Sequence, residues 1–494
     1  MSVRLVYKDI TPGADTAANV ATDLALSMSD TSLIPFGVPA APIASLEPNG
    51  WGLTQEYKTY NRQPVAFWSS AISRADCTFV GSNNPTVTVT FAEKRTTTGL
   101  TVEFGKSAGE WCTQMSISWY FGETLLASET YNPTRPVFVA EKTVSGFTKI
   151  VFTFDKTSLP HRRVKIERII FGVIREFRAA ELAGASFTHE TSLISDTVPV
   201  NVMDAVICSK SGVDMIFQNK QPVEGYDGNR LIGTYYIEHG KQTGKNVYEI
   251  SCHDLVGVWD LDETDGGLWF EDTPLLDILT AIFGDVAVFD IAPEYAASTL
   301  RGHIPAGTKR AALQQIAFAL GAAVDTAGTS KVRIFPAPVG TGSVIPAART
   351  FSGGSIETTD KVTEVTVTAY VIFDERPGEN DEYIEHNGVQ YRYYTDTKHA
   401  YNPDVVSSDP ANKVKYMGAY LVNLSNAQAL ADKLMQYHRR RDTYAFAHVL
   451  DGQAPGDWAV ASLPWGGQAT GNITKMTISV SGITVSDAEM LLDR

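Results

Sequence analysis

Short stretches in which apolar and polar residues alternate dominate the sequence between residues 51 and 172. A period of two with many β-branched and aromatic residues is typical of strands that bury one face. Turn-forming pairs such as Asn132-Pro133 separate these stretches at the intervals seen in β-sandwiches. We therefore predict an all-β sandwich, whose clearest strands are residues 86–91, 100–104, 115–120 and 149–154.

A second β-rich region extends from about residue 175 to residue 258. Residues 239–245 contain two glycines and predict a turn that joins the strands on either side of it in a hairpin. The candidate strands of this region are residues 215–217, 231–237 and 247–252.

The hydrophobic period changes to that of a helix after residue 272. Thr273 and Pro274 predict the start of a helix over residues 275–283, because threonine caps free backbone N–H groups and proline needs no N–H at the first helical position. Thr308 predicts the start of a second helix. Together these elements predict a small α/β module, which is completed by two strands at residues 322–325 and 331–335.

Strand patterns return beyond residue 346, and residues 364–370 form the clearest of them. Residues 374–415 are polar and rich in tyrosine, and we expect them to form an excursion from this part of the fold. Ser425 predicts the cap of a third helix, which has one apolar stripe. The last predicted strands are residues 445–450, 458–462 and 473–480.

Composition narrows the class of protein. Hydrophobic residues make up 44% of the 494 residues and charged residues 20%, which indicates about three globular domains and excludes a disordered chain. The formal net charge of -15 repels phosphate backbones, so we expect no sequence-specific nucleic-acid binding. Lys8 and Asp9 interrupt the position of a secretory signal, and three aspartates interrupt the most apolar window at residues 275–292. We expect no membrane insertion.

Motifs for chemistry are absent from the sequence. The four cysteines share no CxxC spacing, which indicates neither a zinc knuckle nor a disulfide framework. The run Cys252-His253-Asp254 contains the residue types of a thiol-based triad, but neighbouring side chains in a strand point to opposite faces. We interpret it as a strand end with a buried cysteine and a solvated acid. The chain is therefore predicted to be no enzyme, with no catalytic residue and no cofactor.

An acidic loop at residues 260–271 partly matches the pattern of a calcium-binding loop. Four of its residues fall on positions 1, 3, 5 and 12 of a calcium-binding loop. Position 6, however, is Asp265 instead of the glycine that makes the sharp turn, and a strand is expected before the loop. A solvated turn is the favoured interpretation. The calcium alternative would use Asp260, Asp262, Thr264 and Glu271.

Two further groups of side chains have binding and structural interpretations. The arginines at residues 439–441 would grip phosphate or a partner's carboxylates, or would interact with the C-terminal end of the third helix. Five aromatic residues of the sandwich would stack on a sugar face, or would pack in the core. These residues are Trp51, Tyr57, Tyr60, Trp68 and Trp111.

Four parts of the sequence resemble known families. Residues 181–207 resemble the start of the first barrel in hub proteins of bacteriophage tails and phage-tail-like particles, especially those of Gram-positive hosts. Residues 426–483 resemble the second hub barrel, with a Pro455-Gly456-Asp457 turn between strands, and residues 302–308 resemble the small domain between the barrels. Residues 159–172 are similar to the closing strands of discoidin-like (galactose-binding-like) domains.

The resemblance implies a mainly β fold with two hub-type β-barrels, a small α/β module between them and an N-terminal discoidin-like β-sandwich. An excursion is expected at about residues 374–420. The predicted divisions are an N-terminal segment with a first strand at 1–45, the sandwich at 46–174, the first barrel at 175–265, the module at 266–345 and the second barrel at 346–494.

The resemblance also implies a function. Such hubs are homotrimers that join the hexameric tail tube, through a ring of distal tail protein, to a central spike or fibre. They line a channel for DNA or effectors and meet the tape-measure protein. The expected location is the virion or tail-like particle, contractile or not, made in the cytoplasm of a bacterial host. The alternative function is host adhesion, with the sandwich binding a cell-wall glycan.

Overall fold

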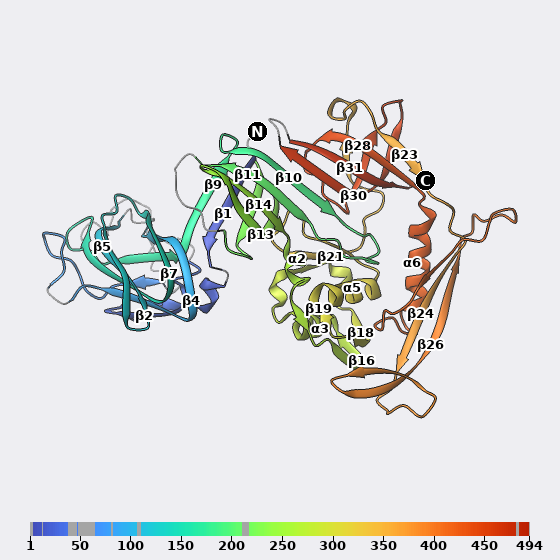
Figure 1. The fold of residues 1–494 in the computed structure, drawn as a ribbon, viewed down its shortest axis with the longest axis horizontal. Helices are drawn as coiled ribbons and strands as arrows, with labels where there is room; N and C mark the ends of the chain where they lie inside the picture. Colours follow the sequence, from blue (N-terminus) through green and yellow to red (C-terminus); the bar gives the residue numbers. More distant parts are fainter. Residues whose placement is uncertain are drawn as a thin grey trace, which may run out of the picture. The chain divides into compact units, whose positions relative to one another are not determined.

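The computed structural model describes residues 3–11, 13–37, 47, 65–80, 83–105, 110–209, 217–480 and 484–493. Strands hold 53% of the residues and helices 12%, which confirms the mainly β class. The chain forms two compact units (Figure 1). The N-terminal unit comprises Val6–Glu176 and Gly212–Pro222, and the C-terminal unit comprises Met1–Leu5, Phe177–Ser211 and Val223–Arg494. No described helix has the length and apolar character needed to cross a membrane.

A seven-stranded sheet forms the N-terminal unit, in the order β3-β8-β4-β7-β5-β6 with β2 beside β4. Two short helical segments, α1 (Ala14–Ala17) and η1 (Thr31–Leu33), lie before β3 in the chain. The strands of the sheet are β2 (Asn19–Asp23), β3 (Phe67–Trp68), β4 (Thr86–Phe104), β5 (Cys112–Phe121), β6 (Thr124–Tyr131), β7 (Val137–Thr157) and β8 (Lys165–Ile170). The chain passes between the units within β1 (Val3–Ile10) and β9 (Gly172–Arg178).

Long, interrupted strands enclose the core of this unit. Strand β4 contains two of the predicted strands, and its register with β7 shifts between Thr90 and Gly99. Such irregularities bend a strand, so the two halves of β4 pair with different partners, β2 before the shift and β8 after it. Alternate side chains of the first half are buried, including Val87 and Val89, whereas residues 97–102 of the second half are all buried. The four predicted strands of this region are confirmed.

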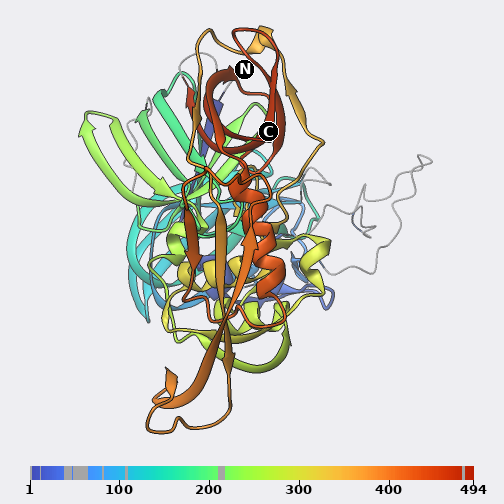
Figure 2. The ribbon, with the colours of Figure 1, turned by 90° about the vertical axis from the view of Figure 1, so that its right-hand side faces the viewer.

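One continuous sheet runs through the C-terminal unit, in the order β23-β28-β31-β30-β10-β11-β14-β13-β12, with β22 beside β29 and β29 beside β30. Its first strands are β10 (Leu182–Glu190), β11 (Val202–Cys208), β12 (Pro222–Asp227), β13 (Arg230–Gly244) and β14 (Val247–His253). Its later strands are β22 (Ser343–Ile345), β23 (Ser355–Thr358), β28 (Asp442–Val449), β29 (Trp458–Ser462), β30 (Gln468–Val480) and β31 (Thr484–Leu492). The red strands of residues 442–492 curl into a roll (Figure 2).

This sheet differs in two places from what the sequence predicted. The predicted turn at residues 239–245 belongs to β13, which pairs with β14 up to Gly244, and the chain reverses at Asn246 with a φ of 62°. Both faces of this part of the strand are exposed and carry polar side chains. The sequence therefore lacks the apolar–polar alternation that would have predicted a strand here. Strand β31 was not predicted, although it pairs with both β28 and β30.

Helices and short strands form the predicted α/β module. Thr308 caps α5 by accepting a hydrogen bond from the backbone N–H of Ala311, and Gly321 ends this helix with a φ of 60°, so the predicted start is confirmed. The first helix starts differently, because Pro274 is its N-cap and the Thr273 hydroxyl donates to the carbonyl of Glu271. The helices and 3-10 segment of the module are α2 (Leu255–Trp259), α3 (Leu275–Phe283), η2 (Val286–Val288), α4 (Pro293–Ala296) and α5 (Lys309–Leu320).

Short strands complete the module. Antiparallel strands β20 and β21 confirm the predicted pair around a turn. The strands are β15 (Glu263–Thr264), β16 (Gly267–Pro274), β17 (Phe289–Ile291), β18 (Thr299–Ile304), β19 (Gly307–Thr308), β20 (Ala323–Asp325) and β21 (Val332–Phe335).

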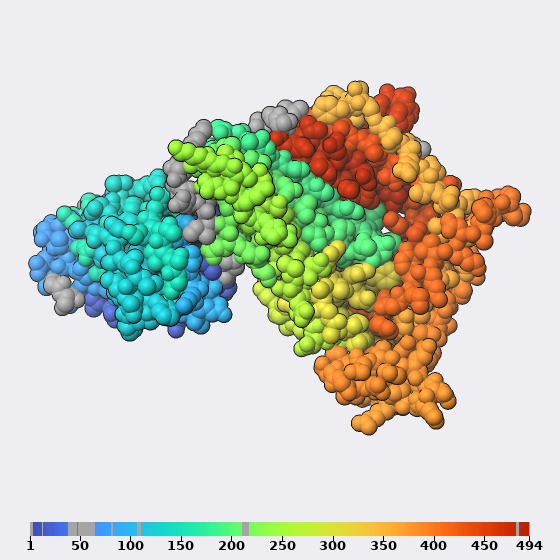
Figure 3. Space-filling model, in the orientation of Figure 1, coloured from blue at the N-terminus to red at the C-terminus, as the bar shows by residue number. Residues whose placement is uncertain are grey.

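A separate four-stranded sheet, in the order β25-β26-β24-β27, contains the predicted excursion. Its strands are β24 (Glu364–Ile372), β25 (Glu382–His386), β26 (Val389–Tyr401) and β27 (Lys413–Tyr416). The predicted strand at residues 364–370 is confirmed as β24, but its neighbours are strands of the excursion. The orange residues of this sheet form a lobe that protrudes from the unit (Figure 3).

Helix α6 (Ala427–Arg439) packs this sheet against the module. Its buried residues Leu430 and Leu434 belong to one hydrophobic cluster with Val365 of β24 and Leu313 of α5. The core therefore crosses the predicted boundary at residue 345. The predicted Ser425 cap is wrong, because Asn426 is the N-cap residue and Ser425 donates to the side chain of Asn423.

Candidate functional site

Two acidic and two basic side chains form a buried ion cluster in the N-terminal unit. Lys165, at the start of β8, lies 2.5 Å from Glu47 and 2.7 Å from Glu110. Arg162 donates to the other carboxylate oxygen of Glu110 at 2.6 Å. Each of the four side chains is at most 14% exposed. The charges therefore compensate one another inside the protein, where water contributes little.

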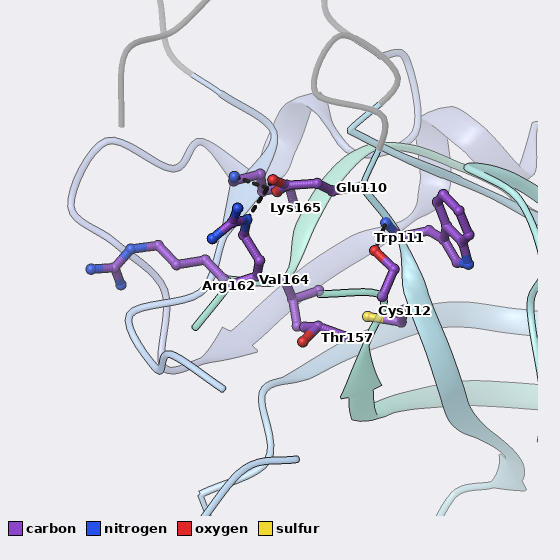
Figure 4. Close-up of a pocket in the computed structure, with 9 residues that line it drawn as sticks. Glu110, Trp111, Cys112, Thr157, Arg162, Val164 and Lys165 are labelled. Atoms are coloured by element: carbon purple, nitrogen blue, oxygen red, sulfur yellow. Dashed lines mark hydrogen bonds and ion pairs between the residues drawn. The ribbon is translucent and has the colours of Figure 1, made fainter. Parts of the chain in front are cut away.

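Figure 4 shows how closely this ion cluster is filled. Glu110 reaches Lys165 and Arg162, while the Trp111 ring lies on the side of the pocket away from the ion pairs. The remaining space is a cavity of about 10 Å³ that Cys112 and Thr157 also line. A cavity of this size holds about one water molecule. The cluster is therefore a structural cross-link and has no room for a sugar ring.

Both described members of the predicted sugar-binding set make contacts within the unit. The Lys165 ammonium lies 4.7 Å from the centroid of the Trp68 ring. The indole N–H of Trp111 donates to the carbonyl of Pro133 at 3.2 Å. Three predicted members lie outside the described residues: Trp51, Tyr57 and Tyr60. Sugar binding by this set stays a prediction.

The predicted calcium-loop residues lie in different local structures. Asp260 follows helix α2, where a strand was expected, and pairs with Arg310 at 2.9 Å. The Asp262 carbonyl accepts from the backbone N–H at the start of α5, Thr264 lies in β15, and Glu271 lies in β16. Throughout the part of the chain that the structure describes, no group of three or more His, Cys, Asp or Glu side chains could hold a metal ion.

A buried polar network surrounds Asp254, which the sequence predicted to be solvated. Asp254 is 1% exposed and caps α2 by accepting from the backbone N–H of Gly257 at 3.0 Å. Its other oxygen accepts from the Thr326 hydroxyl at 2.5 Å, and Asn201 donates to that hydroxyl at 2.8 Å. The prediction of a solvated acid is therefore wrong, because residues far away in the sequence cover this carboxylate.

More titratable groups belong to the same network. Asp325 is 2% exposed and accepts from Arg333 at 2.6 Å, and His189 is hydrogen-bonded to the Tyr235 hydroxyl. Burial raises the pKa of Asp254 to about 6 and lowers the pKa of His189 to about 4. Sequence reasoning missed this network because its members come from β10, β13, α2, β20 and β21, with no local motif. Its chemistry is cross-linking by hydrogen bonds.

The three arginines at the C-terminal end of α6 bind separate segments of the C-terminal unit. Arg439 pairs with Asp404 at 2.9 Å, and Arg440 donates to the Asn472 side chain at 2.8 Å. Arg441 donates to the carbonyl of Thr359 at 2.8 Å. Arg439 lies in the last turn of α6, as the helix-end interpretation predicted, and tertiary contacts occupy all three guanidinium groups.

Comparisons with known proteins give structural similarities at low sequence identity. No protein-family profile matches the sequence, and no curated protein matches it. A tail protein from Neisseria meningitidis MC58 is similar over 65% of this chain and 94% of its own, with 14% identity and a TM-score of 0.46. A 43 kDa tail protein of prophage MuSo2 from Shewanella oneidensis is similar over 65% and 96%, with 9% identity and a TM-score of 0.42.

A third similar structure is prophage tail protein gp18 from Listeria monocytogenes EGD-e, over 64% of this chain and 91% of its own. Its identity is 11% and its TM-score 0.42. All three TM-scores are below 0.5, so these similarities assign no role to this chain.

Proposed function

We propose that the chain is a structural component of a phage tail or tail-like particle, and that it is the trimeric hub of the baseplate or tail tip. In this role it joins the hexameric tail tube and its distal tail protein ring to a central spike or fibre. It lines the channel for DNA or effectors and meets the tape-measure protein. The chain acts through assembly instead of catalysis.

The main support for this proposal is the pairing of two segments that lie far apart in the sequence. Strand β10 lies in the segment that resembles the first hub barrel, and β30 lies in the segment that resembles the second. The two strands pair in antiparallel register from Ala185 opposite Val480 to Glu190 opposite Lys475. The two resembling segments are therefore neighbours in one sheet, as expected if both belong to a single assembly element.

Two strands with an unpaired edge support an oligomer. Strands β22 and β23 have three and four residues, and each is paired along only one edge within the described chain. Val344 of β22 is 61% exposed. Unpaired strand edges and exposed apolar side chains favour association, and a closed ring of copies would cover them.

Light scattering of the purified chain tests the trimer. We expect a mass three times the 53.8 kDa of one chain, and we expect Val344→Asp to lower it because a charge would enter the interface. Val389→Asp, at a 41% exposed position on the four-stranded sheet, is the matched control. A monomer at every concentration, together with a single copy in isolated particles, would contradict the proposal.

Host adhesion through the N-terminal unit is the second candidate function. The half-buried rings of Trp68 and Trp111 are the observation that favours it. A glycan array and a cell-wall pull-down with the full chain test it. Binding that Trp111→Ala weakens and Trp465→Ala leaves unchanged would support adhesion, whereas no binding would leave this unit purely architectural.

A further inference from the structure

We propose that His303 and His386 bind one divalent transition-metal ion between the α/β module and the four-stranded sheet. The proposal concerns a site that the hub function does not use, so each can fail without the other. It is an open site with two protein ligands, with water in the remaining positions.

His303 has two ring nitrogens that the described protein leaves without partners. The side chain lies on β18 and is 3% exposed, yet neither Nδ1 nor Nε2 has a hydrogen-bond partner. Leaving a buried polar atom without a partner costs about 1–3 kcal/mol, so such atoms frequently mark an ion or water site. A metal binds the lone pair of an imidazole nitrogen, so either ring nitrogen of His303 can serve as a ligand.

His386 faces His303 from the end of the β25–β26 hairpin. The two ring centroids are 5.4 Å apart and the ring planes are nearly perpendicular, at 80°. His386 is directly followed by Asn387 and Gly388, whose φ values of 51° and 76° form a tight two-residue turn. This turn fixes the backbone that carries His386. His386 is only partly buried, so an ion has a path from solvent.

The separation of the rings fits a shared metal. A metal lies about 2.1 Å from a ligating nitrogen, and therefore about 3.2 Å from the centroid of the imidazole ring. Two such rings at the tetrahedral angle have centroids about 5.2 Å apart. The observed separation of 5.4 Å is close to this value. Imidazole nitrogens suit Zn²⁺, Ni²⁺ and Cu²⁺, so the ligand type selects this class of ion.

Neighbouring groups support the orientation of both rings. The side-chain amide nitrogen of Asn387 lies 3.2 Å from His386 Nε2 in an exposed contact between adjacent residues, and a flip of this amide would leave the Nδ1 lone pair for the metal. The backbone N–H of His303 donates to the carbonyl of Tyr420 at 3.3 Å, which holds β18 beside the next segment. Phe270 and Tyr391 pack nearby with ring centroids 5.4 Å apart. A bound ion would therefore clamp the hairpin to the module.

Calorimetric titration of ZnCl₂ into the untagged, chelator-treated full chain tests the site. We expect one equivalent to bind and to raise the melting temperature. His303→Phe and His386→Phe keep an aromatic ring for packing but remove the ligating nitrogens, so each should abolish both effects. His239→Ala removes a histidine whose side chain is 81% exposed and should change neither effect.

Two results would overturn the proposal. An absence of zinc binding by the wild-type chain would mean that the histidines make only an edge-to-face packing contact. Binding that His386→Phe retains would place the ion elsewhere. His386 is partly exposed, so this variant is expected to fold even where His303→Phe does not.

Discussion

At the scale of single residues, buried titratable groups determine how stability depends on pH. The Asp254 carboxyl has a pKa near 6 in the folded chain, chiefly because it is buried, against an ordinary value of 3.8. The folded state therefore binds a proton more tightly than the unfolded state. Between pH 4 and pH 6 this group lowers the free energy of unfolding as pH rises.

Asp254→Asn should remove this dependence. The asparagine oxygen still accepts from the Gly257 N–H, and its amide can donate to the Thr326 hydroxyl, so the cap of α2 survives. Relative to wild type, the variant should gain on the order of 3 kcal/mol of stability between pH 4 and pH 7. Urea unfolding at both pH values measures the difference. An equal difference at the two pH values would contradict the assigned direction of the pKa shift.

His189 has the opposite effect on how stability depends on pH. Its folded pKa of about 4 lies below the ordinary 6.5, so its contribution to stability is complete above pH 6.5 and is lost as pH falls toward 4. His189→Phe should flatten the loss of stability over this range in the same urea experiments. His239→Ala, at an exposed position, should leave the wild-type slope unchanged.

The ion cluster should be sensitive to loss of one charge. Lys165→Met leaves the carboxylates of Glu47 and Glu110 without their shared cation, which should cost about 3–5 kcal/mol. Lys142→Met breaks an exposed pair with Glu129 and should cost less than about 1 kcal/mol. Chemical denaturation followed by tryptophan fluorescence compares the two. Equal effects would mean that water already reaches Lys165.

At the scale of elements, two threonines that look alike in the sequence differ in their contribution to stability. Thr308→Ala removes the cap of α5 and should lower the free energy of unfolding by about 1 kcal/mol. Thr273→Ala should cost less than this, because Thr273 caps no helix. Urea unfolding of both variants measures the two losses in the free energy of unfolding. A larger effect at Thr273 would contradict the observed start of α3.

Sequence periodicity predicted most elements but not their caps. Helix α3 has the predicted bounds, and α6 buries the predicted stripe. The predicted caps at Thr273 and Ser425 are wrong because several polar residues precede each helix, and tertiary contacts decide which residue takes the N-cap position. The Asn387-Gly388 turn carried a strong hairpin signal that the polar composition of residues 374–415 obscured.

At the scale of the whole molecule, each of the two units has a hydrophobic core among its described residues. Phe152 and Trp119 lie in the core of the N-terminal unit, whereas Leu434 and Leu313 lie in a core of the C-terminal unit. Each unit therefore contains enough buried apolar surface for its own cooperative transition.

Scanning calorimetry should show two transitions. Lys165→Met should lower the melting temperature of one transition, and Leu434→Ala, which leaves a cavity costing about 2–5 kcal/mol, should lower the other. Gln436→Ala, at an exposed position on the same helix as Leu434, should change neither. A single transition that moves with both variants would mean that the units unfold together.

The sequence by itself determined the mainly β class, the positions of most strands and two helix bounds, because alternation and helical period are local properties of the chain. Only the tertiary structure decided that β10 lies beside β30, that β24 pairs within the four-stranded sheet and that Asp254 is buried. Strand pairing and burial depend on residues tens to hundreds of positions apart. The ion cluster and the facing histidines follow the same rule, since their members share no sequence motif and meet only when the sheets have formed.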